Sequence, residues 1–492
     1  MTHKIISPAK SLIYVVLVFL STSCSKEYFD KYPTDQPTEN TFYSDEVSVK
    51  QMLNDAYFSL RESYRYCFAF GDLAADDVYN SKFNNSSDHI TINESNVVAD
   101  NGIISEMWTR SYATIARANL VLENIENITI EPAPKAQYIN EAKFLRALMY
   151  FNLVRIYGDV PLVLKDVKTP AEALSYSRES SQQVYEQIIT DLKDAEQLPS
   201  SYTVNADIGR ATKWAAKSLL AKVYLTLKQY NEADFKLAEV LAAPPASGAN
   251  AFHLLNNYAD IFDAAKPNNS EVIFAVQYAR GFDPLQGNPF VNYAMANEDI
   301  GTGILKRGTG TFLMTESLNA QFSSGDTRRS MISELTGSRR KYVFTKKYYD
   351  NQMTTTIDAG NDWIVLRYGD VVLMYAETQN ELGNTSIAFN YLEAVRTRAG
   401  LTTDQNLRNI QASMKLAIEN ERRLELFNEG HRWFDLKRTD RLIPVMNAHF
   451  ASGLSNDEIG SGNSVQEFEL IFPVPRYQVN LNPEKIQQNP GY

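Results

Sequence analysis

The sequence predicts a mostly α-helical protein in which a helical scaffold carries one irregular part made of loops and short strands. Three observations support this prediction. Apolar residues recur at steps of three and four along most of the chain after residue 46, and two segments share the spacing of a helical repeat. By contrast, residues 244–362 are rich in Pro, Gly, Asn and Ser.

The segment 137–157 illustrates the helical pattern. Its apolar stripe consists of Ala142, Leu145, Met149, Leu153 and Ile156. Gly158 then occupies a position suited to a left-handed residue that ends a helix, and Pro161 prevents continuation. Similar stripes predict helices over residues 47–66, 103–126, 181–197, 211–228, 231–242, 368–382, 385–399 and 410–429.

Two helix pairs have the spacing of a tetratricopeptide repeat. In the first, the packing positions are Leu220, Ala221, Tyr224, Tyr230, Ala233 and Leu237, and Lys228 replaces the glycine usual at the turn. In the second they are Tyr375, Ala376, Gly383, Ala388 and Leu392. Two isolated repeats cannot bury their apolar faces, so we expect further helix pairs beside them in a tetratricopeptide-like scaffold.

The irregular part is predicted to carry recognition, because loops on a rigid support often do. It contains one strand candidate, Glu271 to Tyr278 (EVIFAVQY). A second strand candidate, Glu467 to Phe472 (EFELIF), lies near the carboxyl end. We therefore divide the chain after residue 45 into a helical region (46–243), an irregular insert (244–362) and a carboxyl-terminal region (363–492).

The amino terminus predicts export and lipidation. Lys4 and Lys10 precede the apolar run Leu12 to Leu20, which is too short to span a bilayer, and Ser21-Thr22-Ser23-Cys24 follows. We expect a signal peptide over 1–23, acylation of Cys24, and an extended tether over 24–45. An ordinary signal peptide with an incidental cysteine is the alternative. Cys67 is then the only other cysteine, which excludes an intramolecular disulfide.

Composition and motifs argue against nucleic-acid binding and catalysis. The formal net charge is −11, and no basic patch with interleaved aromatics is present. No two of the five histidines have the helical spacing of a zinc site, and no cofactor motif occurs, so we expect neither metal nor cofactor. Asp76-Asp77 is the best carboxylate pair for a glycoside hydrolase, but adjacent aspartates are more often turn formers, caps or hydrogen-bond acceptors. We expect no catalytic residues.

The most densely charged stretch runs from Ile418 to Arg438 (IENERRLELFNEGHRWFDLKR). Glu419 and Arg423 are four residues apart and should pair on a helix face, and Gly430 should end that helix. Buried arginines there need carboxylate partners, which Glu421, Glu425 or Asp435 can supply. Nothing in the stretch pairs a nucleophile with a base, so we predict that it braces the fold.

This stretch strongly resembles the hallmark of the SusD/RagB family of outer-membrane nutrient-binding lipoproteins. Three other segments resemble motifs of that family in the expected order, namely EAKFLRALMYFNLVRIYGDVPLV (141–163), VLRYGDVVLMYAE (365–377) and the terminal NPGY. The segment from Tyr28 to Tyr57 also resembles the family's amino-terminal pattern. The resemblance covers essentially the chain from Cys24 to Tyr492.

The resemblance implies a fold with four tetratricopeptide-like helix pairs and a function in nutrient capture. It implies a lipid-anchored position on the outer face of the outer membrane, a TonB-dependent (SusC-like) transporter as partner, and a glycan ligand that is delivered without cleavage. A peptide ligand is the first alternative. A glycoside hydrolase, and a repeat scaffold that binds only proteins, are alternatives from other classes.

Glycan-binding members of the family use exposed loop aromatics, and pyranose rings lie flat on such side chains. Trp108, Trp214 and Trp433 fall in helical motifs and are expected to be core or interhelix anchors. The expected ligand-binding residues are Tyr66, Asp77, Tyr79, Phe83, Phe282, Phe290, Tyr293 and Trp363, with Phe68, Asp76, Asn80 and Asn288 as neighbours.

Overall fold

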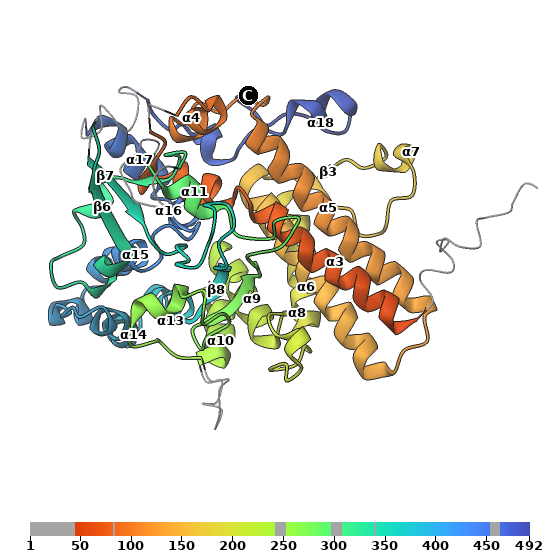
Figure 1. Ribbon diagram of the computed structural model, residues 1–492, viewed down its shortest axis with the longest axis horizontal. Coiled ribbons are helices and arrows are strands. Elements are labelled where there is room, and N and C mark those ends of the chain that lie inside the picture. Colours follow the sequence, from red (N-terminus) through yellow and green to blue (C-terminus); the bar gives the residue numbers. More distant parts are fainter. Residues whose placement is uncertain (1–44, 82–83, 242–251, 297–307, 339–340, 453–462) are drawn as a thin grey trace, which may run out of the picture.

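In the part of the chain that the structure describes, four helix pairs form the scaffold, and Figure 1 shows their arrangement. A computed structural model describes residues 45–81, 84–241, 252–296, 308–338, 341–452 and 463–492. The pairs are α3 (Glu46–Tyr64) with α5 (Gly102–Asn124), α6 (Pro132–Tyr157) with α8 (Ser181–Ala195), α9 (Lys213–Thr226) with α10 (Tyr230–Leu241), and α13 (Tyr368–Glu381) with α14 (Thr385–Arg398). Each pair packs against the next through α5 and α6, α8 and α9, and α10 and α13. The prediction of a mostly helical repeat scaffold is confirmed.

The turns of the two repeat-like pairs have the geometry that the sequence indicates. Gly383 has a φ of +84°, and Lys228, which replaces glycine in the first pair, has a φ of +58°. Gly158 ends α6 with a φ of +73°, and its N–H donates to the carbonyl of Val154. These helix ends therefore lie at the turn residues that the sequence predicts.

The predicted helix over 410–429 is shorter than expected, because α15 covers only Gln411–Glu425. Here side chains, and not further helical N–H groups, donate to the backbone carbonyls. Arg367 Nη2 donates to the Glu425 carbonyl at 2.7 Å, and Lys347 Nζ donates to the Phe427 carbonyl at 2.6 Å. Asn428 and Gly430 then take positive φ values of +59° and +81°. The helix ends at Glu425, whose carbonyl accepts from a side chain in place of a further helical N–H.

The described strands are short and form antiparallel pairs, two of which join the irregular part to the rest of the chain. β1 (Val78–Tyr79) pairs with β5 (Leu313–Met314), β4 (Val272–Val276) with β8 (Trp363–Arg367), and β6 (Ile332–Thr336) with β7 (Lys341–Thr345), while β2 (Val160–Pro161) and β3 (Arg178–Glu179) form a fourth pair. The strand predicted at Glu271 to Tyr278 is thus confirmed as β4. The strand predicted at Glu467 to Phe472 is wrong, because Glu467–Leu470 form a 3-10 turn in which Glu469 caps the N–H of Gln466.

Shorter helices complete the described chain. They are α4 (Ser87–Asn93), α7 (Pro170–Ala173), α11 (Phe290–Ala294), α12 (Glu316–Asn319), α16 (Arg432–Arg438), α17 (Leu442–Ala451) and α18 (Arg476–Leu481), with a π-helical turn at Ala69–Leu73. The main hydrophobic core lies between the scaffold helices and also takes in residues of the irregular part, among them Phe290 and Trp363. Trp108 and Trp433 are buried, as expected for core anchors, and Trp214 packs against the core half-buried.

Candidate ligand-binding surface

The charged stretch at α15 forms a buried ion-pair network. Glu425 accepts from Arg367 Nη1 at 2.6 Å and from Arg328 Nη1 at 3.2 Å, and it also contacts Arg398. Glu429 contacts Arg367 Nε at 2.7 Å and Lys347 Nζ at 2.6 Å. Burial would raise the pKa of Glu425, but the three guanidinium groups outweigh it and hold that pKa below its ordinary value.

This network is a brace. The side chains of Glu425, Arg328 and Arg367 are at most 1% exposed, so no substrate reaches them. Arg328 also pairs with Glu421 at 2.6 Å, and Arg422 pairs with Asp435 at 3.0 Å. Of the three expected partners, Asp435 pairs with arginines of the stretch itself, whereas Glu421 and Glu425 pair with arginines from other segments.

The expected pair of Glu419 with Arg423 does not form. Arg423 instead contacts Asp77 Oδ1 through Nε at 2.6 Å and Asp76 Oδ2 through Nη2 at 2.9 Å. Glu419 contacts Arg441 at 3.1 Å. An exposed pair on one helix contributes only tenths of a kcal/mol, whereas buried carboxylates need a cationic partner, so the long-range contact prevails.

Asp76 and Asp77 are hydrogen-bond acceptors and do not form an acid pair of the glycosidase kind. Arg432 Nε lies 2.7 Å from Asp76 Oδ1. Burial would raise the pKa of Asp76, but Arg423 and Arg432 hold it below its ordinary value. Asp77, 1% exposed, is corrected from a ligand contact to an anchor that joins the segment after α3 to α15.

The two aromatic groups predicted from the sequence meet in one cluster. The ring centroids of Phe68 and Phe290 lie 5.0 Å apart, those of Phe68 and Tyr293 lie 5.0 Å apart, and those of Tyr66 and Tyr293 lie 6.5 Å apart. Trp363 lies 4.5 Å from Phe290. The segment after α3 and the irregular insert are therefore in contact at this place.

Only part of this cluster is accessible. Tyr79, Phe290 and Trp363 are 1%, 2% and 3% exposed, and we correct these three from ligand contacts to core residues. Each of these rings is part of the main hydrophobic core. The neighbours Asp76, Asn80 and Asn288 are buried as well. Tyr66 and Tyr293 are half-buried, and Phe83 lies outside the described residues.

Phe282 lies on a separate, protruding turn. The backbone N–H of Ala279 donates to the carbonyl of Gln286, which closes the turn, and Phe282 and Leu285 are 51% and 53% exposed. Arg61 on α3 holds its base, because its Nε donates to the Gln277 carbonyl at 2.7 Å and its Nη1 to Gln286 Oε1 at 2.8 Å. The turn is thus fixed to the scaffold while its apolar tip faces solvent.

Sequence reasoning missed Arg61, Arg65 and His89. Arg61 and Arg65 are four residues apart at the end of a predicted helix, so their shared face was a usable signal. His89 on α4 lies with its ring stacked on Phe68 at 6.2 Å, and burial lowers its pKa to about 4. It is therefore neutral at pH 7. We call Arg65, Tyr66, His89 and Tyr293 the tyrosine rim.

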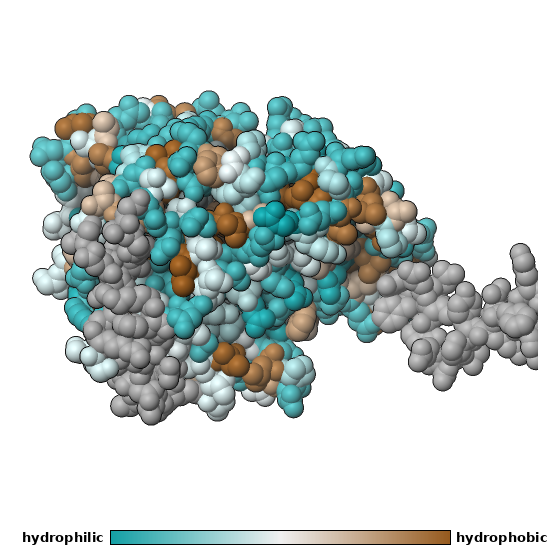
Figure 2. All heavy atoms as spheres, turned by 90° about the horizontal axis from the view of Figure 1, so that it is seen from above, coloured by the Kyte–Doolittle hydropathy of each residue, from teal (hydrophilic) through white to brown (hydrophobic). Residues whose placement is uncertain are grey.

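A groove lies between α5, α7 and α18. It has a volume of about 320 Å³ and is lined mainly by apolar side chains, with Trp108, Tyr112 and Tyr176 as its aromatic members. Figure 2 shows that hydrophobic residues on the face seen from above occur in several separate patches. Tyr176 and this groove provide a comparison for the tyrosine rim.

The described residues contain neither a metal-binding cluster nor a membrane-spanning helix. The described ranges contain no group of three or more His, Cys, Asp or Glu residues arranged to hold a metal ion. Within the same ranges, every helix is too short or too polar to cross a bilayer.

Comparisons with known proteins agree with this architecture. The chain matches a sequence model described as "SusD family" over residues 323–492 and one described as "Starch-binding associating with outer membrane" over residues 27–225. SusD-like protein P25 of Formosa agariphila is 26% identical over 98% of this chain and 99% of its own length.

Solved structures have the same fold. Surface glycan-binding protein A of Bacteroides thetaiotaomicron, in complex with laminarihexaose, is 21% identical with a TM-score of 0.77, over 91% of this chain and all of its own. A laminarin-binding SusD-like protein is 25% identical with a TM-score of 0.73, over 92% of this chain and all of its own. The ordered motifs, the helix pairs and these matches lead to one conclusion: the chain belongs to the SusD/RagB family.

Proposed function

We propose that this protein is a non-catalytic glycan-binding protein of the bacterial outer membrane. The observation that carries the proposal is its likeness, over 92% of the chain, to a SusD-like protein that binds laminarin. The family description "Starch-binding associating with outer membrane" supports the same ligand class and location. SusD-family glycan-binding proteins are non-catalytic, which agrees with the prediction that this chain is not an enzyme.

The tyrosine rim is the proposed contact surface. Two tyrosine rings with centroids 6.5 Å apart present apolar faces with a hydroxyl at the edge, which suits a pyranose ring with its C–H groups on one side and hydroxyls around it. Arg65 is exposed beside them and supplies donors for sugar oxygens. The exposed tip with Phe282 is held by Arg61, one helical turn before Arg65, and extends the apolar surface for a longer chain.

Affinity gel electrophoresis tests the rim. We expect Tyr66→Ala and Tyr293→Ala to lose most of the retardation that the unchanged protein shows in gels containing laminarin or starch. Stacking of a sugar on one aromatic ring is worth on the order of 1 kcal/mol, so each loss should be about fivefold or more in affinity. Tyr176→Ala, which removes a half-buried tyrosine of the groove beside α5, is the matched control and should leave retardation unchanged.

The outcomes separate the alternatives. Retardation lost by Tyr176→Ala and kept by both rim variants would move the site to the groove. Binding of peptides without binding of any polysaccharide would favour the peptide ligand. New reducing ends released from a polysaccharide by the purified protein would contradict a non-catalytic role and support the glycoside hydrolase.

Delivery to a TonB-dependent transporter and anchoring through Cys24 complete the proposal. Both are implied by the family motifs, and Cys24 lies outside the described residues. Metabolic labelling with a palmitate analogue should mark the unchanged protein and spare Cys24→Ser. Affinity purification from solubilised outer membranes should recover a TonB-dependent barrel, and its absence would contradict the partner.

A further inference from the structure

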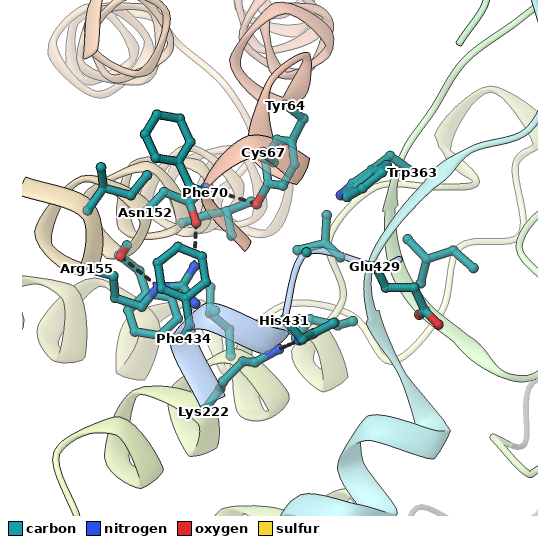
Figure 3. A pocket seen from close by; sticks show the side chains of 18 of the residues that line it. Tyr64, Cys67, Phe70, Asn152, Arg155, Lys222, Trp363, Glu429, His431 and Phe434 are labelled. Atoms are coloured by element: carbon teal, nitrogen blue, oxygen red, sulfur yellow. Dashed lines mark hydrogen bonds between the residues drawn. The ribbon is translucent and has the colours of Figure 1, made fainter. Parts of the chain in front are cut away.

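A small pocket lies where α6 meets α16, on the inner side of the aromatic cluster, and Trp363 and Cys67 form part of its wall. Its volume is about 50 Å³, and its polar wall contains Asn152, Arg155, Lys222, Glu429 and His431. Figure 3 shows Arg155 on one side of the pocket and the pair of Lys222 and His431 on the other.

Arg155 is held firmly but lacks a countercharge. Its guanidinium carbon lies 4.0 Å from the ring centre of Phe151 and 4.1 Å from that of Phe434. Its Nε donates to the Phe151 carbonyl at 3.1 Å, and its Nη2 donates to Asn152 Oδ1 at 2.7 Å. Within the described residues, Nη1 has no hydrogen-bond partner and no carboxylate pairs with this guanidinium.

Lys437 on α16 lies behind the pocket wall, next to Arg155, and also lacks an ion-pair partner in the described chain. Its Nζ donates to the backbone carbonyl of Arg155 at 2.9 Å, and no carboxylate of the described chain pairs with it. Burial, and then the nearby Arg155, lower its pKa to about 7. The nearby carboxylates pair with other cations. Asp370 pairs with Lys222 and Arg422, Asp435 pairs with Arg422 and Arg438, and Glu377 pairs with Arg438.

The opposite wall can supply a further donor. Lys222 Nζ lies 3.1 Å from His431 Nδ1 and 2.9 Å from Asp370 Oδ2. Burial, and then Lys222, lower the pKa of His431 to about 3, so the ring is neutral at pH 7. Because Nδ1 accepts from the lysine, the ring proton is on Nε2, which makes His431 a donor as well. Glu429 also lines the pocket, but its oxygens accept from Lys347 and Arg367 at 2.6 to 2.9 Å.

We propose that this pocket binds a small monovalent anion of halide size. An unpaired guanidinium in a partly buried setting is costly, and an anion beside Nη1 would supply the missing countercharge. A volume of about 50 Å³ accommodates one such ion with a water molecule. The ion would join α6 to α16 and so link the amino-terminal and carboxyl-terminal parts of the fold.

Anomalous diffraction tests the site directly. Crystals of the soluble mature chain soaked in sodium bromide should show an anomalous peak in the pocket, within contact distance of Arg155 Nη1. A peak confined to exposed surface sites, with ordinary water in the pocket, would overturn the proposal. This measurement needs no variant and is independent of glycan binding.

Thermal unfolding provides the second test. At constant ionic strength, replacing sodium gluconate by sodium bromide should raise Tm by roughly 1–2 °C for each tenfold increase in bromide above its Kd. Arg155→Met should abolish this dependence. Arg408→Met is the matched control, because Arg408 also covers an aromatic ring, Phe389, at 3.7 Å but has acceptors in Asn390 and Gln405. An equal bromide response in wild type and Arg155→Met would overturn the proposal.

Discussion

Lys228 lies in the turn between α9 and α10 with its backbone in the left-handed region, at a φ of +58°. At the equivalent turn between α13 and α14, Gly383 has a φ of +84°. A side chain in this conformation costs about 1 kcal/mol, because its Cβ crowds the following carbonyl oxygen. The exposed contact of Lys228 Nζ with Asp440 at 2.5 Å offsets little of this cost.

We therefore expect Lys228→Gly to stabilise the protein by up to about 1 kcal/mol. The reciprocal substitution, Gly383→Ala, should destabilise it by a similar amount, although nothing lies within 4 Å of a Cβ placed there. Chemical denaturation of the two variants beside wild type measures both. A loss of stability in Lys228→Gly would show that the Asp440 contact outweighs the backbone strain.

Asp362 provides a pH-dependent test of the base of the exposed turn. Its Oδ1 accepts from the N–H of Tyr278 at 2.9 Å, and burial raises its pKa to about 7. A carboxyl group with a raised pKa in the folded state contributes stability below its unfolded pKa of about 4, and this stability is lost as the pH rises towards 7.

Asn in place of Asp362 keeps the acceptor and cannot ionise. We expect Asp362→Asn to be close to wild type in Tm at pH 5 and more stable at pH 8, by on the order of 1 kcal/mol. The difference between the two proteins, followed by calorimetry from pH 5 to pH 8, isolates this group. A constant difference across that range would contradict a raised pKa.

At the scale of elements, the network around α15 fixes the ends of several helices and strands at once. Arg367 ends β8 and contacts Glu271, Glu425 and Glu429. It also donates to the carbonyl of Glu425 at the end of α15, and Lys347 donates to the carbonyl of Phe427 just after it. Loss of one partner leaves the others buried without a countercharge, which is more costly than loss of an exposed pair.

We expect Arg367→Met to destabilise the protein by about 3–5 kcal/mol. Arg117→Met is the control, because Arg117 pairs with Asp55 on the surface, with the two side chains 38% and 57% exposed, and its loss should cost less than about 1 kcal/mol. Denaturant midpoints give the comparison. If both substitutions cost the same, the buried network would not be the brace that its contacts indicate.

The scaffold helices could be predicted because their apolar stripes, end-capping residues and turn glycines are all local. The error at Glu467 to Phe472 arose because alternation of apolar and polar residues in so short a run also fits a 3-10 turn that a side chain caps. The contact of Arg423 with Asp76 and Asp77 spans about 350 residues, so no local pattern could reveal it.

The proposed contact surface was only partly predictable for the same reason. The sequence identified the two aromatic groups that meet in space, yet Tyr79, Phe290 and Trp363 proved buried, while Tyr66 and Tyr293 stayed half-buried. Loop aromatics have no periodicity that separates inside from outside. Their exposure depends on strand pairings such as β4 with β8, which join residues some 90 positions apart.

At the scale of the whole molecule, the amino-terminal and carboxyl-terminal parts form one structure. Besides the contacts of Arg423, Arg432 Nε donates to Asp76 Oδ1 at 2.7 Å, and the N–H of Gly430 donates to Asp72 Oδ2 at 2.7 Å. In an amino-terminal fragment, Asp72, Asp76 and Asp77 would lose these hydrogen-bond donors.

We therefore expect a fragment ending at residue 241 to be unstable alone, with no cooperative thermal transition in circular dichroism. Coexpression with residues 252–492 should restore a soluble complex, because these residues supply the partners of Asp72, Asp76 and Asp77. A fragment that unfolds cooperatively by itself would show that the helix pairs up to α10 form an independent domain.

The two family matches leave residues 226–322 unassigned, and that interval contains the turn that carries Phe282. Arg61 binds the base of this turn through Gln277 and Gln286. The N–H of Gly281 donates to Asp358 Oδ2 at 2.9 Å, so the exposed tip begins at Phe282. The exposed residues from Phe282 to Leu285 are therefore the part of the turn that can be substituted at the least cost in stability. If the proposed function holds, substitutions at these exposed positions should change ligand preference while leaving the fold intact.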